Sequence, residues 1–272
     1  MENKIDIIIP YWGEFSLLKQ AVDSVLEQTS DAWHLTILDD HYPDETAKNY
    51  YNKINDKRIT YIRHRKNIGI TNNFNYAVKY ASAPFCVIMG CDDKLLSNYV
   101  ETALKNINEA DFYQPGVQVI DAKSNTYLPL VDKIKRLLHP KKSCVLAGEK
   151  LATSLCNGNW LYFPSIVWRT STLKKYSFDP RYKILQDVII ELTMIIDGAS
   201  LCFDSTETFQ YRRFADSLSS KEKGKNGIRF NEEKEVYNNF ANKFNDINWK
   251  KASFAAKTRI TSRVHSLLSK FW

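Results

Sequence analysis

The stretch VIMGCDDKL, residues 87–95, carries an apolar run directly into Gly90, Cys91 and two adjacent aspartates. Neighbouring carboxylates repel each other, and each loses hydration when it lies close to an apolar core. Solvent, a basic partner or a bound cation can offset that cost. Asp92 and Asp93 are therefore expected to mark either a solvated turn at the end of a strand or a binding site.

Upstream of this stretch, short apolar runs alternate with segments of helical periodicity. The predicted strands cover residues 5–9, 34–40, 58–64 and 85–90, and the predicted helices cover 14–28, 44–54 and 67–81. Continuous apolar runs are typical of parallel strands that are buried on both faces. The order β-α-β-α-β-α-β predicts an α/β fold with a mostly parallel, Rossmann-like sheet and helices on both of its faces.

Polar and aromatic residues follow each predicted strand. In parallel α/β sheets, ligands bind beyond the carboxyl ends of the strands. Loops from separate strands are therefore expected to meet at one sheet edge, and they contain Pro10, Tyr11, Trp12, Glu14, Asp39, Asp40, Asn67, Gly69, Asp92 and Asp93.

The second half of the chain has a looser pattern. Helices are predicted over residues 96–109 and 184–197, and the second of these carries Asp187 and Glu191 four residues apart. A further helix is expected to start near Ala252, and the polar stretch 216–227 reads as a linker. In the aromatic segment at 158–169, Trp160 and Tyr162 either belong to the core or stack on a sugar acceptor.

Composition and charge exclude several classes of protein. The 272 residues include 44% hydrophobic and 25% charged residues, and no segment approaches the roughly 18–20 apolar residues of a membrane span. Five scattered cysteines predict neither a zinc site nor a disulfide framework, which fits the cytoplasm. The net charge of +7 is concentrated at 133–142 and 250–272. No basic stripe accompanies the motifs of the first half, which argues against nucleic acid, and PYWGEF after the first strand lacks a dinucleotide-binding fingerprint.

Five motifs in this order resemble the inverting family 2 glycosyltransferases of bacterial surface-glycan synthesis, which have the GT-A fold. They are IIIPYWGE at 7–14, LDD at 38–40, NIGI at 67–70, GCDD at 90–93 and LQD at 185–187. The resemblance implies a nucleotide-sugar-binding half at 1–110 and an acceptor-binding half with the catalytic base at 111–220. A polar linker and basic amphipathic C-terminal helices would follow at 221–272.

The resemblance also implies roles for individual residues. Asp93 would bind Mn²⁺ or Mg²⁺, although Cys91 replaces the first acid of the family's metal motif. Asp187 would be the general base, with helix capping or a salt bridge as its structural alternatives. The nucleotide would contact Pro10, Tyr11, Glu14, Asp40, Asn67, Gly69, Asp92 and either Arg212 or Arg213. Phe214 stands where many members have a histidine.

The function implied is transfer of a sugar from a nucleoside-diphosphate donor, with a UDP-sugar as the expected one, to a surface glycan or a lipid-linked saccharide. A retaining transferase and a non-catalytic nucleotide- or glycan-binding protein on the same scaffold are the alternatives. The basic C-terminal helix has three readings: it docks on the fold, lies on an anionic membrane surface, or joins a dimer. The protein is expected in the cytoplasm, with peripheral association at the inner face of the cell membrane under the second reading.

Overall fold

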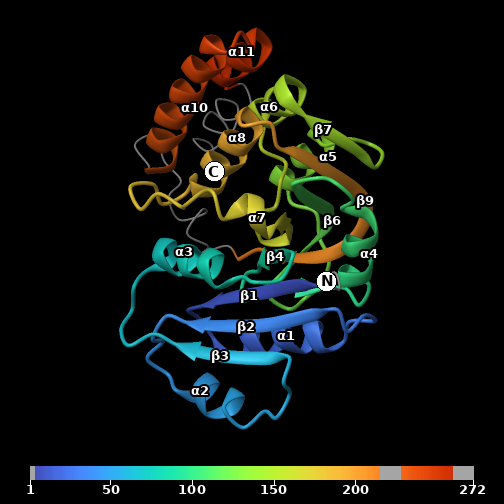
Figure 1. Ribbon diagram of the computed structural model, residues 1–272, viewed down its shortest axis with the longest axis vertical. Helices are drawn as coiled ribbons and strands as arrows, with labels where there is room; N and C mark the ends of the chain where they lie inside the picture. The colour runs from blue at the N-terminus through green and yellow to red at the C-terminus, as the bar shows by residue number, and fades with distance from the viewer. Residues whose placement is uncertain (1–3, 215–227, 260–272) are drawn as a thin grey trace.

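The computed structural model describes residues 4–214 and 228–259. A nine-stranded mixed sheet runs through it in the order β3-β2-β1-β4-β8-β6-β9-β5, and β7 pairs with β9 outside that path. Figure 1 shows the first strands at one end of the molecule and the last helices at the other. The predicted α/β class is confirmed.

The first half of the sheet is parallel, as its continuous apolar runs predict. β1 (Ile5–Tyr11) lies between β2 (Trp33–Asp39) and β4 (Phe85–Ile88), and β3 (Ile59–Arg63) pairs with β2 at the edge. The connecting helices are α1 (Phe15–Leu26), α2 (Thr46–Tyr51) and α3 (Ile70–Tyr80). Every element predicted before residue 90 is present, although the ends differ from the predicted bounds.

β1 shows why these strands are apolar at successive positions. Ile8 belongs to one buried cluster, whereas Ile7 and Ile9 belong to another that also contains Leu18 and Val22 of α1. Side chains alternate across a strand, so a strand covered on both faces needs apolar residues at odd and even positions alike.

Pro10 lies inside β1, although the sequence predicts that it ends this strand. It pairs with Leu38 of β2. The amide of Met89 donates to the carbonyl of Ile8, so the backbone of residue 10 also faces the β4 side, where strand pairing ends at Ile8 and Ile88. An N–H group at residue 10 would therefore have no strand partner, so a proline, which lacks this group, is tolerated here.

The second half of the sheet changes direction at β8 (Val167–Arg169), which is antiparallel to both β4 and β6 (Phe112–Ile120). β6 runs parallel to β9 (Ser200–Arg212), which also pairs with β5 (Lys94–Leu95) and β7 (Cys144–Ala147). The sequence does not predict β9, because exposed polar residues at 205–207 interrupt its apolar pattern.

Helices pack around this second half. α4 (Tyr99–Asn106) and α8 (Gln186–Ile196) confirm the helices predicted over 96–109 and 184–197. The others are α5 (Leu130–Leu138), α6 (Gly148–Asn157), α7 (Thr170–Leu173) and the 3₁₀ turn η1 (Phe163–Ser165). α5 contains part of the basic cluster at 133–142.

Two helices complete the described chain, and Figure 1 shows them beside α6 and α8. α10 (Ile228–Asp246) was not predicted, and α11 (Lys250–Thr258) begins close to the start expected near Ala252. α11 packs on α6 and α10 with Ala252, Ala255 and Ala256 buried, so residues 250–258 dock on the fold. The membrane and dimer readings rest on residues 260–272, and the predicted linker at 216–227 also lies outside the described residues.

Within residues 4–214 and 228–259, no helix has the length and apolar character that crossing a membrane requires.

Gly116 lies at a break in register between β6 and β9. A Cβ atom there would lie 2.8 Å from the carbonyl oxygen of Ser205 and 2.9 Å from the amide nitrogen of Glu207. Because backbone atoms cannot move aside easily, Gly116→Ala should lower the free energy of unfolding by about 1–3 kcal/mol in urea titrations. Gly13→Ala is the control, since its Cβ would meet only Cys91 Sγ at 3.7 Å; equal losses in both variants would contradict the account.

Candidate active site

Asp40 ties the loop before α3 to the carboxyl end of β2. Its Oδ1 accepts from the Ile68 amide at 2.7 Å, and its Oδ2 accepts from the Gly69 amide at 2.9 Å. Gly69 has a φ of 82°, a left-handed conformation that favours glycine. The structure therefore brings together Asp40, Asn67 and Gly69, as the sheet-edge argument predicts, and their contact with a nucleotide stays a prediction.

Asp39 has a structural position beside this loop. It is fully buried, its Oδ1 accepts from the Tyr42 amide at 2.8 Å, and its Oδ2 accepts from the Tyr61 hydroxyl. Arg63 lies 3.6 Å from the same carboxylate. These contacts account for its charge without a ligand.

The loop after β1 presents a different aromatic residue from the one predicted. Tyr11 is only 1% exposed, and its ring packs against Tyr42 inside the fold. Trp12 is 49% exposed and meets Tyr42 edge-on at 5.3 Å between ring centroids. Pro10 is buried and Glu14 is exposed. The ring of Tyr11 is therefore unavailable for stacking on a base, and Trp12 offers aromatic surface at this edge.

Asp92 and Asp93 follow β4 and fold over Gly90. A Cβ at Gly90 would lie 2.5 Å from Asp93 Oδ2 and 3.1 Å from Asp92 Oδ1, so glycine allows the close approach. Asp93 is 1% exposed, and its Oδ1 accepts from the Arg212 amide at 2.8 Å. Burial, together with the adjacent charge of Asp92, raises the pKa of Asp93 well above its ordinary value, and burial also raises the pKa of Asp92.

Arg212 is not available for the phosphate contact predicted for it. It is 3% exposed, and its guanidinium donates to the backbone carbonyls of Asp92 and Asp121 at 2.7 and 2.9 Å and to Gln20 Oε1 at 3.0 Å. Its side chain holds the Asp92–Asp93 turn against the end of β9. Of the two arginines proposed for phosphate binding, Arg213 alone remains a candidate.

The two carboxylates fit a hard divalent cation. No group of three or more His, Cys, Asp or Glu side chains in the described chain could hold a metal unaided. Mg²⁺ and Mn²⁺ commonly use one or two carboxylates and complete their coordination with substrate phosphates and water. Arg212 bonds the backbone of Asp92 rather than its carboxylate, and the described residues form no ion pair with Asp92 or Asp93. Burial and the charge of Asp92 raise the pKa of the Cys91 thiol to about 12. A thiol is also a soft ligand, whereas Mg²⁺ and Mn²⁺ prefer carboxylate, carbonyl and water oxygens.

Asp187 lies in the first turn of α8 and lines a cavity of about 270 Å³. The cavity is also lined by Lys135 of α5, by Tyr211 and Arg213 at the end of β9, and by Arg229 of α10. Burial raises the pKa of Asp187, while the charges of Lys135 and Arg229 oppose that rise. A partly buried carboxylate with a raised pKa is a stronger base than one in water.

A buried ion pair fixes Arg213 at the cavity. Asp132 is fully buried and accepts from Arg213 Nε at 2.6 Å, from Arg213 Nη2 at 2.9 Å and from the Tyr162 hydroxyl at 2.6 Å. Lys135 lies over the Tyr162 ring at 4.1 Å and donates to the Leu161 carbonyl at 2.6 Å. Burial lowers the pKa of Lys135 to about 8.

Glu191 is a buried acid beside Asp187, to which the sequence analysis assigned no role. It is fully buried one turn after Asp187, its Oε2 accepts from Asn159 Nδ2 at 3.0 Å, and its Oε1 has no hydrogen-bond partner within the described chain. Burial and the charge of Asp187 raise its pKa well above the ordinary value, and Lys135 opposes this. The four-residue spacing of Asp187 and Glu191, which places both acids on one face of the helix, was the sequence signal that could have indicated their proximity.

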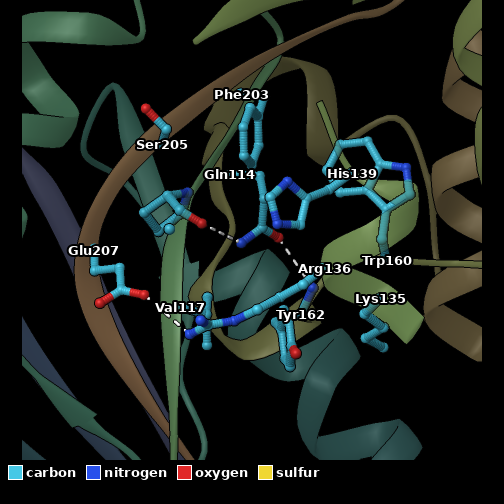
Figure 2. A pocket seen from close by; sticks show the side chains of 12 residues that line it. Gln114, Val117, Lys135, Arg136, His139, Trp160, Tyr162, Phe203, Ser205 and Glu207 are labelled. Atoms are coloured by element: carbon cyan, nitrogen blue, oxygen red, sulfur yellow. Dashed lines mark hydrogen bonds and ion pairs between the residues drawn. The ribbon is translucent and has the colours of Figure 1, made fainter. Parts of the chain in front are cut away.

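Trp160 and Tyr162 contribute to a second cavity of about 270 Å³, which shares Lys135 with the first. Figure 2 shows Trp160 beside His139, and Arg136 extending from α5 to Glu207 of β9. Trp160 is 2% exposed and its Nε1 donates to Ser154 Oγ, so its burial argues against the stacking role predicted for it. Tyr162 is partly exposed beside Lys135.

Comparison with known proteins identifies the family. The sequence model for "Glycosyl transferase family 2" matches residues 6–170, which is more than half of the chain. The chain belongs to this family. The structure is similar to the crystal structure of S. aureus TarS 1–349 in complex with UDP-GlcNAc, with a TM-score of 0.66 and 16% sequence identity. The match covers 89% of this chain and 66% of that chain. This likeness shows the GT-A fold, in agreement with the predicted fold.

Curated relatives match parts of the chain. WfgD of Escherichia coli, a UDP-Glc:alpha-D-GlcNAc-diphosphoundecaprenol beta-1,3-glucosyltransferase, is 27% identical over 122 residues, which cover 44% of this chain and 48% of WfgD. An uncharacterized glycosyltransferase of Rickettsia bellii is 28% identical over 111 residues, 41% of this chain and 16% of that protein. The chain thus spans less than a fifth of the length of three Rickettsia glycosyltransferases that it matches.

The raised pKa of Glu191 has a measurable effect on stability. A carboxyl group whose pKa is higher in the folded state than in the unfolded state makes the fold less stable as pH rises between these two values. Glu191→Gln should therefore lose less free energy of unfolding than the wild type between about pH 5 and about pH 8. Urea titrations at both pH values measure this, with Glu109→Gln, an exposed acid, as control. Parallel changes in wild type and Glu191→Gln would refute a raised pKa.

Proposed function

We propose that the protein is an inverting, metal-dependent glycosyltransferase that moves one sugar from a UDP-sugar to a hydroxyl group of a surface glycan or a lipid-linked saccharide. The observation that carries the proposal is the placement of two carboxylate sites at the same strand end. Asp93 accepts from the amide of Arg212, and the next residue, Arg213, lines the cavity that contains Asp187.

The donor belongs on the Asp92–Asp93 side of this strand end. There the loop fixed by Asp40 offers a position for the nucleoside, and Arg213 offers a guanidinium for the phosphates. Asp93, with Asp92 beside it, would hold Mg²⁺ or Mn²⁺. A divalent cation bound there would neutralise negative charge on the leaving diphosphate. The UDP-GlcNAc complex of TarS and the UDP-Glc in the name of WfgD support a UDP-sugar as donor.

The acceptor belongs in the cavity on the Asp187 side. The Asp187 carboxylate takes the proton of the acceptor hydroxyl as its oxygen bonds to the anomeric carbon. The bond between that carbon and the diphosphate breaks on the opposite face, which inverts the anomeric centre. The charges of Lys135 and Arg229 oppose the rise in the pKa of Asp187 and so favour the ionised carboxylate that this task requires.

The acceptor named for WfgD is a diphosphoundecaprenol-linked saccharide. By analogy, a lipid-linked acceptor would have this protein work in the cytoplasm at the inner face of the cell membrane. Residues 260–272, which include Arg263 and Lys270, are the segment to test for such contact.

Substitution of the proposed base tests the reaction directly. Asp187→Asn keeps the size of the side chain but removes its basicity, so transfer from UDP-sugars should fall by roughly 10²- to 10⁴-fold while UDP binding stays unchanged. Asp197→Asn, an exposed acid at the other end of α8, is the matched control and should keep full turnover. An Asp187→Asn enzyme with wild-type turnover would rule out this base.

A further inference from the structure

The C-terminal helices bring cationic side chains to the cavity that contains Asp187. Arg229 of α10 and Arg259, the residue directly after α11, line it together with Lys135 and Arg213. The family match ends at residue 170, so membership of the family assigns no role to Arg229 or Arg259.

Acids account for the charges of three of these four cations. Arg213 pairs with Asp132 at 2.6 Å and Arg229 pairs with Glu233 at 3.0 Å. The charges of Asp132 and Asp187 stabilise the charged form of Lys135. Arg259 differs from the other three. It forms no ion pair with an acid of the described chain, and its Nε is buried without a hydrogen-bond partner.

The backbone at the end of α11 fixes the position of Arg259 at this cavity. Its amide donates to the Ala255 carbonyl at 3.0 Å, and its φ of 45° ends α11 in a left-handed turn that residues other than glycine rarely adopt. The helix that holds this turn is itself anchored. Ser253 Oγ donates to the Ala241 carbonyl at 2.8 Å, and the Lys251 amide donates to Glu149 at 2.6 Å.

A buried guanidinium nitrogen without a partner is costly, and phosphate or carboxylate oxygens are its preferred partners. We propose that Arg259 binds an oxyanion carried by the acceptor, so that the acceptor of this enzyme is an anionic saccharide. This inference rests on the proposed function, because it takes the cavity of Asp187 as the acceptor site.

The position of Arg259 favours the acceptor over the donor. The donor diphosphate is assigned to Asp93 and Arg213, and Asp93 does not line the cavity. Arg259 lines it together with Cys156 and Tyr237, on the side formed by α6 and α10. The oxyanion can be a phosphate ester or the carboxylate of an acidic sugar, since a guanidinium accepts either.

The experiment measures anion binding by isothermal titration calorimetry with the full chain. Methyl phosphate and glucuronate are the probes for the two sources of an oxyanion, and each is titrated with and without saturating UDP and Mn²⁺. The wild type should bind at least one probe, and Arg259→Gln should weaken that binding by roughly 10- to 100-fold while UDP binding stays unchanged. Arg259→Lys keeps the charge and should fall between the two. Lys257→Gln removes the same charge from an exposed position on α11 and should bind like the wild type.

Three results would overturn the proposal. They are failure of the wild type to bind either probe, equal binding by wild type and Arg259→Gln, and a loss of UDP binding in Arg259→Gln, which would assign the residue to the donor. Failure of the wild type to bind UDP would instead contradict the proposed function, and the titrations without UDP separate that case from the others.

Discussion

The hydrogen bond from the Arg212 amide to the Asp93 carboxylate, 2.8 Å long, is the constraint on which the site depends. It joins the turn after β4, in the parallel half of the sheet, to the end of β9, in the mixed half. The guanidinium of Arg212 reinforces the same junction through the carbonyls of Asp92 and Asp121. Because Arg212 is fixed in this way, the next residue, Arg213, enters the cavity of Asp187.

Electrostatics at this junction explain why acids can accumulate in it. Each buried carboxylate is costly by itself, and the cost falls when an opposite charge or a proton accompanies it. Asp132 forms an ion pair with Arg213. The raised pKa of Glu191 favours its protonated form, and the positive charge of Lys135 stabilises the carboxylate of Asp187. Asp92 and Asp93 form no ion pair with the described residues, and the charges of Arg212 and Arg213 offset the effect of burial on the pKa of Asp93 only in part. This is the electrostatic argument for a divalent cation there.

The sequence predicts the parallel half of the sheet well, because each of its strands is a continuous apolar run followed by a helical period. It also predicts that Asp40, Gly69 and the pair after β4 lie at one edge, because parallel strands end on the same side. β9 escapes prediction, since its pairing depends on β5, β6 and β7, which are distant in sequence, and polar residues interrupt its pattern.

Individual side chains are harder to assign than elements. Tyr11 and Trp12 are adjacent aromatics. Tyr11 is the last residue of β1 and is buried against Tyr42, whereas Trp12 lies beyond the end of the strand and is exposed. Arg212 and Arg213 are likewise adjacent, and only the partners of each guanidinium distinguish a structural arginine from one that lines the cavity. Such partners come from remote segments, which residue types and spacing in one sequence do not specify.

The central claim is that Asp93 and a divalent cation together hold the diphosphate of a UDP-sugar. Calorimetric titration of UDP, with and without Mn²⁺, into the wild type and into Asp93→Asn tests it most directly, because asparagine can still accept the hydrogen bond from Arg212. The account predicts that Mn²⁺ strengthens UDP binding to the wild type by at least about tenfold, or about 1.4 kcal/mol, and has little effect on Asp93→Asn. The account would be contradicted if Mn²⁺ strengthened UDP binding equally in both proteins, or if the affinity of the wild type for UDP did not depend on Mn²⁺.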